Sequence, residues 1–380
     1  MNPSVGIITY HAAYNFGSVL QAYATQRAYA LCGADAWIIN YRPASQVAYY
    51  EPLYRTQYSV KTFLRDLLLF PVKRSRIIRA DRFECFINTQ LRLTDRIDST
   101  DQLQQLSDSF DIFVSGSDQI LNIHSNEYQG EGWDAMKPYL LDFAHGSKVS
   151  YASSPANSNT QDLQHISEYL KSFSLLSARE LDSAKRLSRI TGKEIVNVLD
   201  PTLLLTRDEW REVSKSGAEP WLLPSQYAVY YTLDGTKTMI NRVGLLNHLS
   251  DVLGRPVVVI SPFAFFPQSN RLIDGRAAGP AEFVWLIDHA SLVITDSYHG
   301  TLFAMNLETP FFSISDGKGS STRKDQILGR MHVKDSIVEN LQEAIQRIES
   351  TGLPPVKCVD NALDSARETS FEYIRKTLQA

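Results

Sequence analysis

The sequence predicts an α/β fold with two Rossmann-like domains that face each other across a cleft. Short apolar runs alternate with segments of helical periodicity, a pattern typical of parallel sheets covered by helices. The chain has 380 residues, which is too long for one ordinary hydrophobic core. A stretch rich in Trp, Pro, Gly and Ser at 206–225 lies between two α/β halves. We therefore expect an N-terminal domain at 1–205, a C-terminal domain at 206–350, and a helix within 351–380 that crosses back to the first domain.

The first half is expected to begin with a strand–helix–strand unit. Residues 5–9 form an apolar run, Gly17 leads into a helix, and 36–40 form a second apolar run. The other expected elements of this half are strands at 110–114, 148–152 and 194–199, and helices at 61–90 (split by Pro71), 160–173 and 180–190. Because strands in such units pair in parallel, the loops that follow them should meet at one edge of the sheet.

The second half repeats this alternation. Its expected strands are 227–233, 256–260, 292–294 and 310–314. Its expected helices run from about 236 to 252, then over 280–288, 300–306, 324–330 and 337–348, with a last helix at 362–378. Two successive α/β units of similar size are the basis for the two-domain prediction.

The composition excludes several classes of protein. A net charge of −4 gives no electrostatic footprint for nucleic acid. The three cysteines are widely spaced, which favours a reducing compartment, and neither they nor the histidines have metal-ligand spacing. The N-terminal residues lack the pattern of a signal peptide, and no run approaches the roughly 18–20 apolar residues that span a bilayer. We expect a cytoplasmic protein without a metal site.

Basic and apolar residues alternate at 61–82. The basic residues are Lys61, Arg65, Lys73, Arg74, Arg76, Arg79 and Arg82. One interpretation is a pair of helices that cover a domain and expose a basic face. The other is a surface that contacts a phosphate-bearing acceptor or the anionic inner face of a membrane, as a peripheral attachment.

The most informative segment is 291–305. Residues 292–294 are expected to form a buried strand, and a helix is expected to begin at Gly300, so His299 lies where a strand-end loop becomes a helix N-terminus. Ligands of open α/β sheets bind at the carboxyl ends of strands, and a helix N-terminus favours phosphate or carboxylate. Histidine titrates near neutral pH and can transfer protons. We predict half of an anionic-substrate site here, with His299 as its reactive group. Asp296 either orients His299 or caps the helix.

Polar residues also follow the first strand. Asn15, Gly17 and Ser18 lie between this strand and the first helix, where Gly17 permits close backbone approach. Asn15 and Ser18 either hydrogen-bond a sugar or cap the helix. His11, at the end of the same strand, is a weaker candidate for a residue that faces the cleft.

A second polar cluster follows the strand at 110–114. Ser115, Ser117 and Asp118 occupy this strand end, together with Gly116. Asp118 is a candidate base for a sugar hydroxyl; the alternative is that it caps the next helix. The two serines are candidates for hydrogen bonds to a sugar.

Six short motifs occur along the chain in a fixed order. They are TYH at 9–11 with NFGSVLQAYA at 15–24, VSGSDQILN at 114–122, YASS at 151–154, SARE at 177–180, VLDPTLL at 198–204 and TDSYHG at 295–300. Each motif is weakly specific alone. In this order they make the chain resemble the polysaccharide pyruvyl transferase family, from about residue 5 to about residue 330.

The resemblance implies a two-domain fold like that of the GT-B glycosyltransferases. It also implies a pyruvyltransferase that moves the pyruvyl group of phosphoenolpyruvate onto two sugar hydroxyls, forming a cyclic ketal and releasing phosphate, in capsular or exopolysaccharide biosynthesis. Phosphoenolpyruvate is then a co-substrate and no cofactor is needed. The acceptor, a sugar or a lipid-linked oligosaccharide, belongs to the first domain, and phosphoenolpyruvate belongs to the second. His299 and Asp118 are the catalytic candidates.

One position departs from the family pattern. Many relatives have Arg-x-His where this chain has Ser297-Tyr298-His299, so a cation that holds phosphoenolpyruvate must come from elsewhere. Lys318, Arg323 and Lys324, after the next strand, are the nearest candidates in the sequence, and Arg179 is a further one. The substrate-binding candidates are therefore Asn15, Gly17, Ser18, Ser115, Ser117, Arg179, Ser297, Gly300, Lys318 and Arg323.

Two alternative functions fit the same fold. One is a nucleotide-sugar glycosyltransferase, although the second half has no evident acidic ribose contact paired with a base-stacking pocket. The other is a sugar-binding relative that has lost catalysis, which Ser297 in place of arginine would explain.

Overall fold

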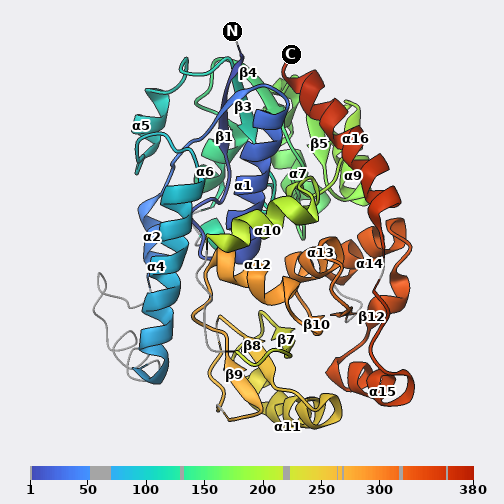
Figure 1. Ribbon diagram of the computed structural model, residues 1–380. Helices are drawn as coiled ribbons and strands as arrows, with labels where there is room; N and C mark the ends of the chain where they lie inside the picture. The colour runs from blue at the N-terminus through green and yellow to red at the C-terminus, as the bar shows by residue number, and fades with distance from the viewer. Residues whose placement is uncertain are drawn as a thin grey trace. The chain divides into compact units, whose positions relative to one another are not determined.

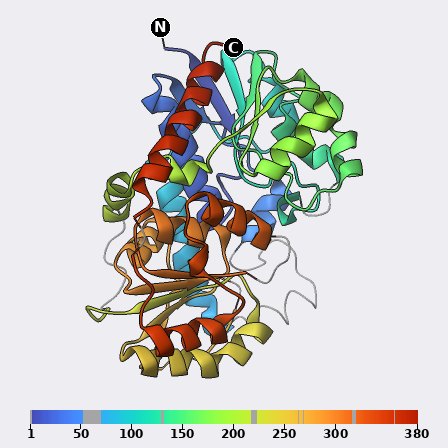
Figure 2. The same ribbon diagram turned by 90° about the vertical axis from the view of Figure 1, so that its right-hand side faces the viewer.

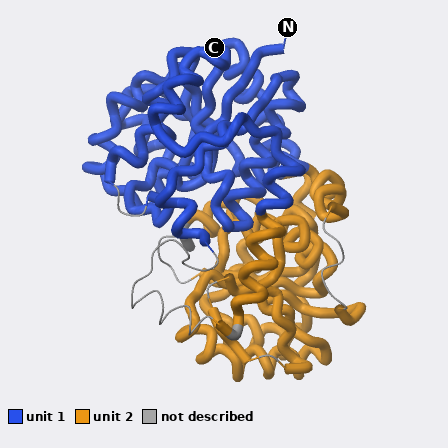
Figure 3. The backbone as a smooth tube through the Cα atoms, turned by 90° about the vertical axis from the view of Figure 1, so that its left-hand side faces the viewer, with its two compact units in different colours: residues 1–51, 84–205, 363–380 blue, residues 52–83, 206–362 orange. Residues whose placement is uncertain are grey.

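The computed structural model describes residues 2–51, 70–128, 132–216, 223–262, 264–267, 269–315, 320–356 and 358–380. The chain forms two compact units (Figure 3). Unit 1 comprises residues 1–51, 84–205 and 363–380, and unit 2 comprises residues 52–83 and 206–362.

Unit 1 is built on a four-stranded sheet in which every neighbouring pair is parallel. Its order is β2-β1-β3-β4, with β1 at Ser4–Ile8, β2 at Asp35–Ile38, β3 at Ile112–Ser115 and β4 at Ser147–Ser150. A smaller parallel pair follows, formed by β5 (Leu176–Ala178) and β6 (Ile195–Asn197). All four residues of β3 are buried, as expected for a parallel strand that is covered on both faces.

Helices connect and cover these strands. Those of unit 1 include α1 (Phe16–Leu31), α2 (Ala44–Tyr50), the second part of α4 (Lys73–Gln90), α5 (Thr100–Gln104), α6 (Trp133–Met136), α7 (Thr160–His165), α8 (Ser167–Ser172) and α9 (Leu181–Thr191), with 3-10 turns η2 (Asn126–Tyr128), η3 (Lys137–Leu140) and η4 (Pro201–Leu203). Twelve of the sixteen residues of α1 are buried. This helix is therefore a core element and not an amphipathic surface helix.

The last helix, α16 (Asp360–Thr377, red in Figure 1), is anchored in unit 1. The hydroxyl of Tyr373 donates to the carbonyl of Ser150 at 2.8 Å, and the hydroxyl of Ser370 accepts from the backbone N–H of Leu199 at 3.0 Å. Both side chains are buried. These hydrogen bonds join a segment at the end of the chain to the sheet that the first residues form.

Unit 2 is built on a six-stranded sheet that is also parallel throughout. Its order is β12-β11-β10-β7-β8-β9, with β7 at Ala228–Tyr231, β8 at Val257–Ile260, β9 at Leu272–Asp274, β10 at Leu292–Thr295, β11 at Phe311–Ile314 and β12 at Ile337–Val338. β10 lies inside the sheet between β7 and β11, and all four of its residues are buried.

The helices of unit 2 include the first part of α4, α10 (Arg207–Lys215), α11 (Thr236–Leu253), α12 (Pro280–Asp288), α13 (Tyr298–Asn306), α14 (Ser320–Arg330) and α15 (Leu341–Thr351), with 3-10 turns η1 (Phe70–Val72) and η5 (Lys334–Ser336). Figures 1 and 2 show α11 and α15 side by side, and His248 Nε2 lies 2.9 Å from Glu349 Oε1 between them. Trp210 of α10 is fully buried and packs edge-on against Phe303 of α13 at 4.9 Å between ring centroids.

Neither unit is a single continuous stretch of the sequence. The sequence assigns residues 1–205 to the first domain, whereas the described residues 70–83 within this range belong to unit 2. There Arg82 lies 3.1 Å from the carboxylate of Glu282 and donates to the carbonyl of Ala277 at 2.8 Å. At the C-terminal end, residues 363–380 belong to unit 1 and the residues before them to unit 2. The helix expected at 160–173 is interrupted at Ile166, which separates α7 from α8.

The basic segment 61–82 is described from residue 70 onward, and residues 61–69 lie outside the described part. Within α4, the guanidinium of Arg79 lies 4.6 Å from the centroid of the Phe83 ring, and Arg82 forms the contacts given above. These two cations therefore contribute to packing within unit 2. Among the described residues, no helix has both the length and the apolar character needed to cross a membrane.

Candidate functional site

The turn between β10 and α13 in unit 2 is the predicted centre of the site. Ser297 is the N-cap of α13: its Oγ accepts from the backbone N–H of Gly300 at 3.3 Å, and its own N–H donates to Oγ1 of Thr295 at 3.0 Å. Serine is a favoured N-cap because its oxygen satisfies an N–H that the helix leaves without an intrahelical partner. Ser297 is only 4% exposed, so local structure explains this residue; the substrate-binding role predicted for it stays a prediction.

Gly300 packs where a side chain would collide with two neighbours. A Cβ at this position would lie 2.6 Å from Oγ1 of Thr295 and 2.7 Å from Cδ1 of Tyr231. Both neighbours are buried at the ends of strands. The glycine therefore allows the first turn of α13 to lie directly against β10 and β7.

His299 occupies the second position of α13, at the strand-to-helix turn that the sequence predicts. The residue is partly exposed, and its ring lies edge-on to that of Tyr298 at 5.2 Å between centroids. The N–H groups of a first helical turn and the positive end of the helix dipole favour an anionic ligand at such a position. The role predicted for the imidazole, contact with a bound anion and exchange of a proton with it, stays a prediction.

Asp296 directs its carboxylate toward the end of β7. It accepts hydrogen bonds from Oγ1 of Thr232 and from the backbone N–H of Leu233, the latter at 3.2 Å. Nη1 of Arg242 lies 3.6 Å from the same carboxylate. Burial raises the pKa of Asp296, and the hydrogen bond from Thr232 acts in the opposite direction. Of the two predicted roles, helix capping belongs to Ser297, and these contacts tie Asp296 to the loop after β7.

Two of the predicted cations lie close to this turn. The guanidinium of Arg323 is 5.6 Å from the centroid of the Tyr298 ring. Lys324 is 1% exposed, and its Nζ donates to the carbonyl oxygen of Asp296 at 2.8 Å and to that of Ile314. A positive charge is thus fixed against the backbone of the turn itself.

A third cation near the turn, Arg79 of α4, is one that sequence reasoning missed. Burial raises the pKa of Tyr231 to about 12, while a hydrogen bond with Ser297 and the positive charge of Arg79 lower it. Arg79 therefore lies within electrostatic reach of the ring that packs against Gly300. The alternation of basic and apolar residues at 61–82 was the available signal, but it was interpreted as a solvated basic face, or as a surface for a membrane or a phosphate-bearing acceptor. Lys318, also predicted here, lies outside the described residues.

In unit 1 the structure brings together residues that follow β1 and β3. Asn15 is the N-cap of α1, with its Oδ1 accepting from the N–H of Gly17 at 2.9 Å. Oγ of Ser18 donates to Oδ2 of Asp118 at 2.6 Å. Asp118 has a φ of 80°, in the left-handed region that is costly for a residue other than glycine and that clusters at functional sites. No α-helix begins directly after Asp118, so it does not cap one, and its predicted role as a base stays a prediction.

The two serines beside Asp118 are directed to backbone carbonyls. Oγ of Ser115 donates to the carbonyl of Tyr139 at 2.7 Å, and Oγ of Ser117 donates to that of Ala152 at 3.2 Å. Both serines are buried. Their contacts support the loops around Asp118, and the sugar-binding role predicted for them stays a prediction.

Arg179 lies among three carboxylates inside unit 1. Its Nε is 2.9 Å from Glu180 Oε1, its Nη1 is 2.8 Å from Asp200 Oδ2, and its Nη2 is 3.7 Å from Asp118 Oδ1. The side chain is 1% exposed. Removing one partner of a buried ion pair typically costs about 3–5 kcal/mol. Arg179 thus holds three carboxylates in position, and its predicted role as a cation for phosphoenolpyruvate stays a prediction.

His11 is buried in unit 1. Its Nε2 lies 3.0 Å from Oδ1 of Asn40 and its Nδ1 lies 3.2 Å from the carbonyl of Thr9. Burial lowers the pKa of His11 to about 4, while the hydrogen bond with Asn40 raises it. The imidazole is therefore neutral at physiological pH and both of its nitrogens have partners within the protein, which indicates a structural role.

Sequence reasoning also missed Glu127 of η2. Burial raises the pKa of this carboxyl to about 7. The hydrogen bonds from Tyr50 and Gln46 lower the pKa, but their effect is smaller than that of burial. The partners come from α2, in a stretch whose sequence reads as aromatic and irregular. No sequence signal links residues 46–50 to residue 127, because only the fold brings them together.

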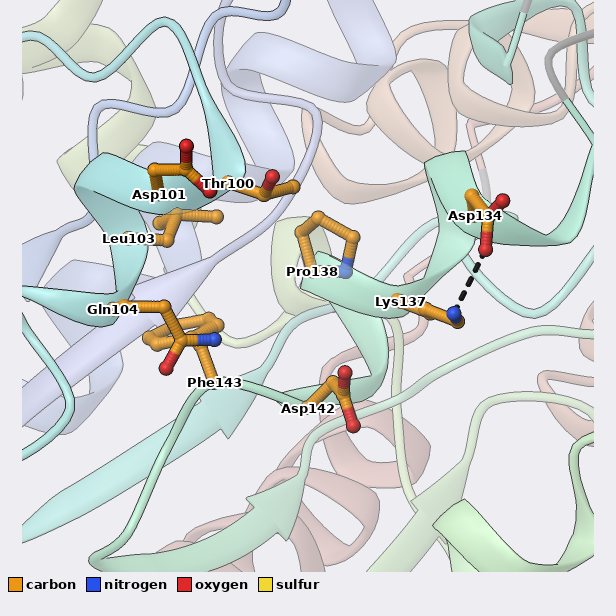
Figure 4. Close-up of a pocket in the computed structure, with 9 residues that line it drawn as sticks. All are labelled: Thr100, Asp101, Leu103, Gln104, Asp134, Lys137, Pro138, Asp142 and Phe143. Atoms are coloured by element: carbon orange, nitrogen blue, oxygen red, sulfur yellow. Dashed lines mark ion pairs between the residues drawn. The ribbon is translucent and has the colours of Figure 1, made fainter.

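Other features of the structure lie apart from these residues. A pocket of about 290 Å³ in unit 1 is lined by Thr100, Asp101, Leu103, Gln104, Asp134, Lys137, Pro138, Asp142 and Phe143 (Figure 4). Its lysine is paired with Asp134 at 2.8 Å, and none of the predicted site residues lines it. In unit 2, Glu308, Cys358 and Asp360 bring potential ligand atoms within 4.8 Å of one another, but Glu308 is paired with Arg207 and the other two are exposed.

A sequence profile of the polysaccharide pyruvyl transferase family matches residues 15–317. The chain belongs to this family. The match includes the β10–α13 turn with His299 and the strand-end residues around Asp118, and it confirms the resemblance that the motifs indicate. No curated protein matches the sequence.

Solved structures with a similar fold include three UDP-GlcNAc 2-epimerases. The enzyme of Methanocaldococcus jannaschii, in complex with UDP-GlcNAc and UDP, is 13% identical with a TM-score of 0.52, over 97% of this chain and 99% of that chain. The enzyme of Rickettsia bellii is 9% identical with a TM-score of 0.53, over 100% of this chain and 96% of that chain. The enzyme of Neisseria meningitidis, bound to UDP-GlcNAc, is 11% identical with a TM-score of 0.50, over 97% of this chain and 99% of that chain. At these identities the likeness shows the fold alone, which is two Rossmann-like domains of the GT-B type, as predicted.

We predict that Gly300→Ala destabilises the protein by about 1–3 kcal/mol, because the added methyl group overpacks the contact with Thr295 and Tyr231. Urea unfolding measures the change. Gly244→Ala in α11 is the matched control, since a Cβ there meets nothing within 4 Å and alanine favours a helix interior. Equal stability of Gly300→Ala and the wild type would contradict the close packing described for α13.

Proposed function

We propose that the protein transfers the pyruvyl group of phosphoenolpyruvate onto two hydroxyls of a sugar and releases phosphate, in capsular or exopolysaccharide biosynthesis. The observation that carries the proposal is His299 in the first turn of α13, within a chain of the polysaccharide pyruvyl transferase family. The reaction requires an acid, a base and groups that hold anions, and its chemistry needs no redox cofactor.

The donor site is assigned to the β10–α13 turn of unit 2. Phosphoenolpyruvate carries a phosphate and a carboxylate, so its site needs several N–H donors or cations. The first turn of α13 offers N–H groups at the positive end of the helix dipole. Arg323, above the Tyr298 ring, and Arg79, within electrostatic reach of Tyr231, supply positive charge where relatives carry an arginine. His299 then delivers a proton to the C3 methylene.

The acceptor site is assigned to the strand ends of unit 1. Asp118 accepts a hydrogen bond from Ser18 at 2.6 Å and lies 3.7 Å from Arg179, and its backbone has a φ of 80°. A carboxylate held in this way can take the proton of a sugar hydroxyl as that hydroxyl attacks C2 of the donor. Asn15, at the N-cap of α1, offers its side-chain amide group to a further sugar hydroxyl.

A sugar-binding protein without catalysis is the competing proposal, and Ser297 in place of arginine is the observation that favours it. A nucleotide-sugar glycosyltransferase is the third. The likeness to nucleotide-sugar enzymes supports only the fold, because the identities are 13% or lower.

His299→Ala is expected to lower phosphate release from phosphoenolpyruvate by about 10²-fold or more in the presence of a galactose-containing acceptor, because it removes the acid that protonates C3. A phosphate assay measures the rate. His248→Ala is the matched control: this histidine is half-exposed and pairs with Glu349 on the surface of unit 2, so the variant should retain the wild-type rate. Wild-type activity of His299→Ala would exclude His299 as the acid, and inactivity of the wild type would favour the protein without catalysis.

Ligand-induced thermal stabilisation distinguishes the donors. A ligand that binds only the native state stabilises it, by about 2.7 kcal/mol when the free ligand is at a hundredfold excess over its dissociation constant. This stabilisation raises the melting temperature. We expect phosphoenolpyruvate to raise it and uridine nucleotides to leave it unchanged, as measured by differential scanning fluorimetry. If only the nucleotides stabilise the protein, the proposed pyruvyltransferase activity is wrong and the glycosyltransferase is favoured.

We further propose a lipid-linked oligosaccharide as acceptor, with peripheral contact between segment 61–82 and the inner face of the membrane. Phe70 is 69% exposed and lies next to the basic residues that begin α4, among which Arg74 is exposed. An apolar ring beside cations suits an anionic interface.

We expect the protein to float with vesicles that contain anionic lipid at low salt, and Phe70→Ser with Arg74→Glu to weaken this binding. Vesicles of neutral lipid are the control. Absence of binding to anionic vesicles at low salt removes the membrane contact and leaves a soluble sugar as the acceptor.

A further inference from the structure

An arginine in the second turn of α11 lies beside the turn that follows β10. Nη1 of Arg242 is 2.7 Å from Oδ2 of Asp234 and 3.6 Å from Oδ2 of Asp296, and it donates to the hydroxyl of Tyr230. Asp296 lies two residues before α13, whose first turn holds His299. These contacts put the guanidinium at the β10–α13 turn, to which the proposed function assigns phosphoenolpyruvate.

All three contacts of Arg242 are made by Nη1. Within the described part of the chain, its Nε and Nη2 donate no hydrogen bond. The side chain is 24% exposed, so it is accessible to a small solute. Nε and Nη2 form a planar fork that matches the two oxygens of a carboxylate. Because Asp234, Asp296 and Tyr230 hold the third nitrogen, the fork is oriented before a ligand binds.

Two other arginines of unit 2 use this fork within the protein. Nε and Nη2 of Arg276 donate to Oδ1 and Oδ2 of Asp274, both at 2.8 Å. Nε and Nη2 of Arg211 donate to the carboxylate of Asp288, both at 3.0 Å. In each of them a carboxylate of the protein occupies the fork, as expected for a structural ion pair. In Arg242 the same two nitrogens are open to a carboxylate from a ligand.

The charges around Arg242 are balanced. Asp234 and Asp296 bring two negative charges to the guanidinium when both are ionised. Arg242 itself supplies one positive charge, and Lys324 supplies another, since its Nζ donates to the carbonyl oxygen of Asp296 at 2.8 Å. These four charges cancel, so the positive end of the α13 dipole is left to favour an anion at the turn.

We propose that Arg242 binds the carboxylate of phosphoenolpyruvate through Nε and Nη2. This inference rests on the proposed function and adds a residue to its donor site. The N–H groups in the first turn of α13 suit the phosphate, which carries the larger charge. The planar carboxylate suits the fork of an arginine. Arg242 then supplies, from α11, an arginine of the kind that many relatives carry at position 297.

Arg242→Lys tests the assignment, because lysine keeps the positive charge beside Asp234 and Asp296 but has no fork. The KM for phosphoenolpyruvate should rise about tenfold or more, since a hydrogen bond between charged groups is lost. The KM for the galactose-containing acceptor should stay unchanged, because the acceptor is assigned to unit 1. Phosphate release at varied concentrations of each substrate measures both constants.

Arg271→Lys is the matched control. This arginine also pairs with an aspartate, at 2.7 Å from Asp251, and it belongs to the same unit. It directly precedes β9, so it lies at the edge of the sheet opposite to the carboxyl ends of the strands. Arg271→Lys should therefore keep the wild-type KM for phosphoenolpyruvate.

Binding of two simple anions separates the carboxylate from the phosphate. Oxalate presents only carboxylates, and inorganic phosphate presents only the phosphate group. By isothermal titration calorimetry, Arg242→Lys should weaken the binding of oxalate about tenfold and leave that of phosphate unchanged. Equal weakening of both, weakening of phosphate alone, or a wild type that does not bind oxalate would overturn the assignment to the carboxylate.

The outcomes separate this inference from the proposed function. An unchanged KM for phosphoenolpyruvate in Arg242→Lys overturns the role of Arg242 and leaves the proposed function intact, because lysine retains a purely structural ion pair. A wild type that releases no phosphate from phosphoenolpyruvate overturns the proposed function, and the role of Arg242 with it. Thermal unfolding shows whether the fold is retained. If lysine destabilises it, Arg242→Gln, which can still donate to Asp234, is the second variant and should raise the KM at least as much.

Discussion

Parallel strand pairing is the constraint on which both units depend. A parallel pair needs a crossover connection, so a helix or loop follows each strand and the residues after the strands meet at one edge of the sheet. In unit 1 this brings Ser18, after β1, within 2.6 Å of Asp118, after β3. In unit 2 it puts His299 at the end of β10, which lies between β7 and β11. The candidate chemistry of each unit is thus a consequence of strand order.

Unit 1 stabilises its carboxylates in two different ways. Asp200 and Glu180 lie at ion-pair distance from Arg179, which compensates their charge inside the protein. Glu127 has only the neutral donors Tyr50 and Gln46 among the described residues. Residues of one chemical type therefore differ in their surroundings: Asp200 and Glu180 are paired with a buried cation, whereas burial raises the pKa of Glu127 to about 7.

Sequence patterns predicted those elements whose signal is local. The apolar run 292–294 followed by Gly300 was enough to locate the β10–α13 turn, and the run 110–114 located β3 and Asp118. Features that depend on long-range packing were missed. The described residues 70–83 lie within the first half of the sequence but belong to unit 2, because contacts such as that of Arg82 with Glu282 are made with residues about 200 positions later.

The serine at position 297 links helix stability with the placement of charge. Its hydroxyl caps α13, a contact that typically contributes about 1 kcal/mol and that an arginine side chain cannot provide. A cation at a helix N-terminus also opposes the helix dipole. The cations that lie near this turn come from another element: Lys324 of α14 donates to the carbonyl of Asp296, and Arg323 lies over the ring of Tyr298. Because α14 follows β11, the neighbour of β10, the parallel order of the sheet brings these cations to the turn that lacks its own.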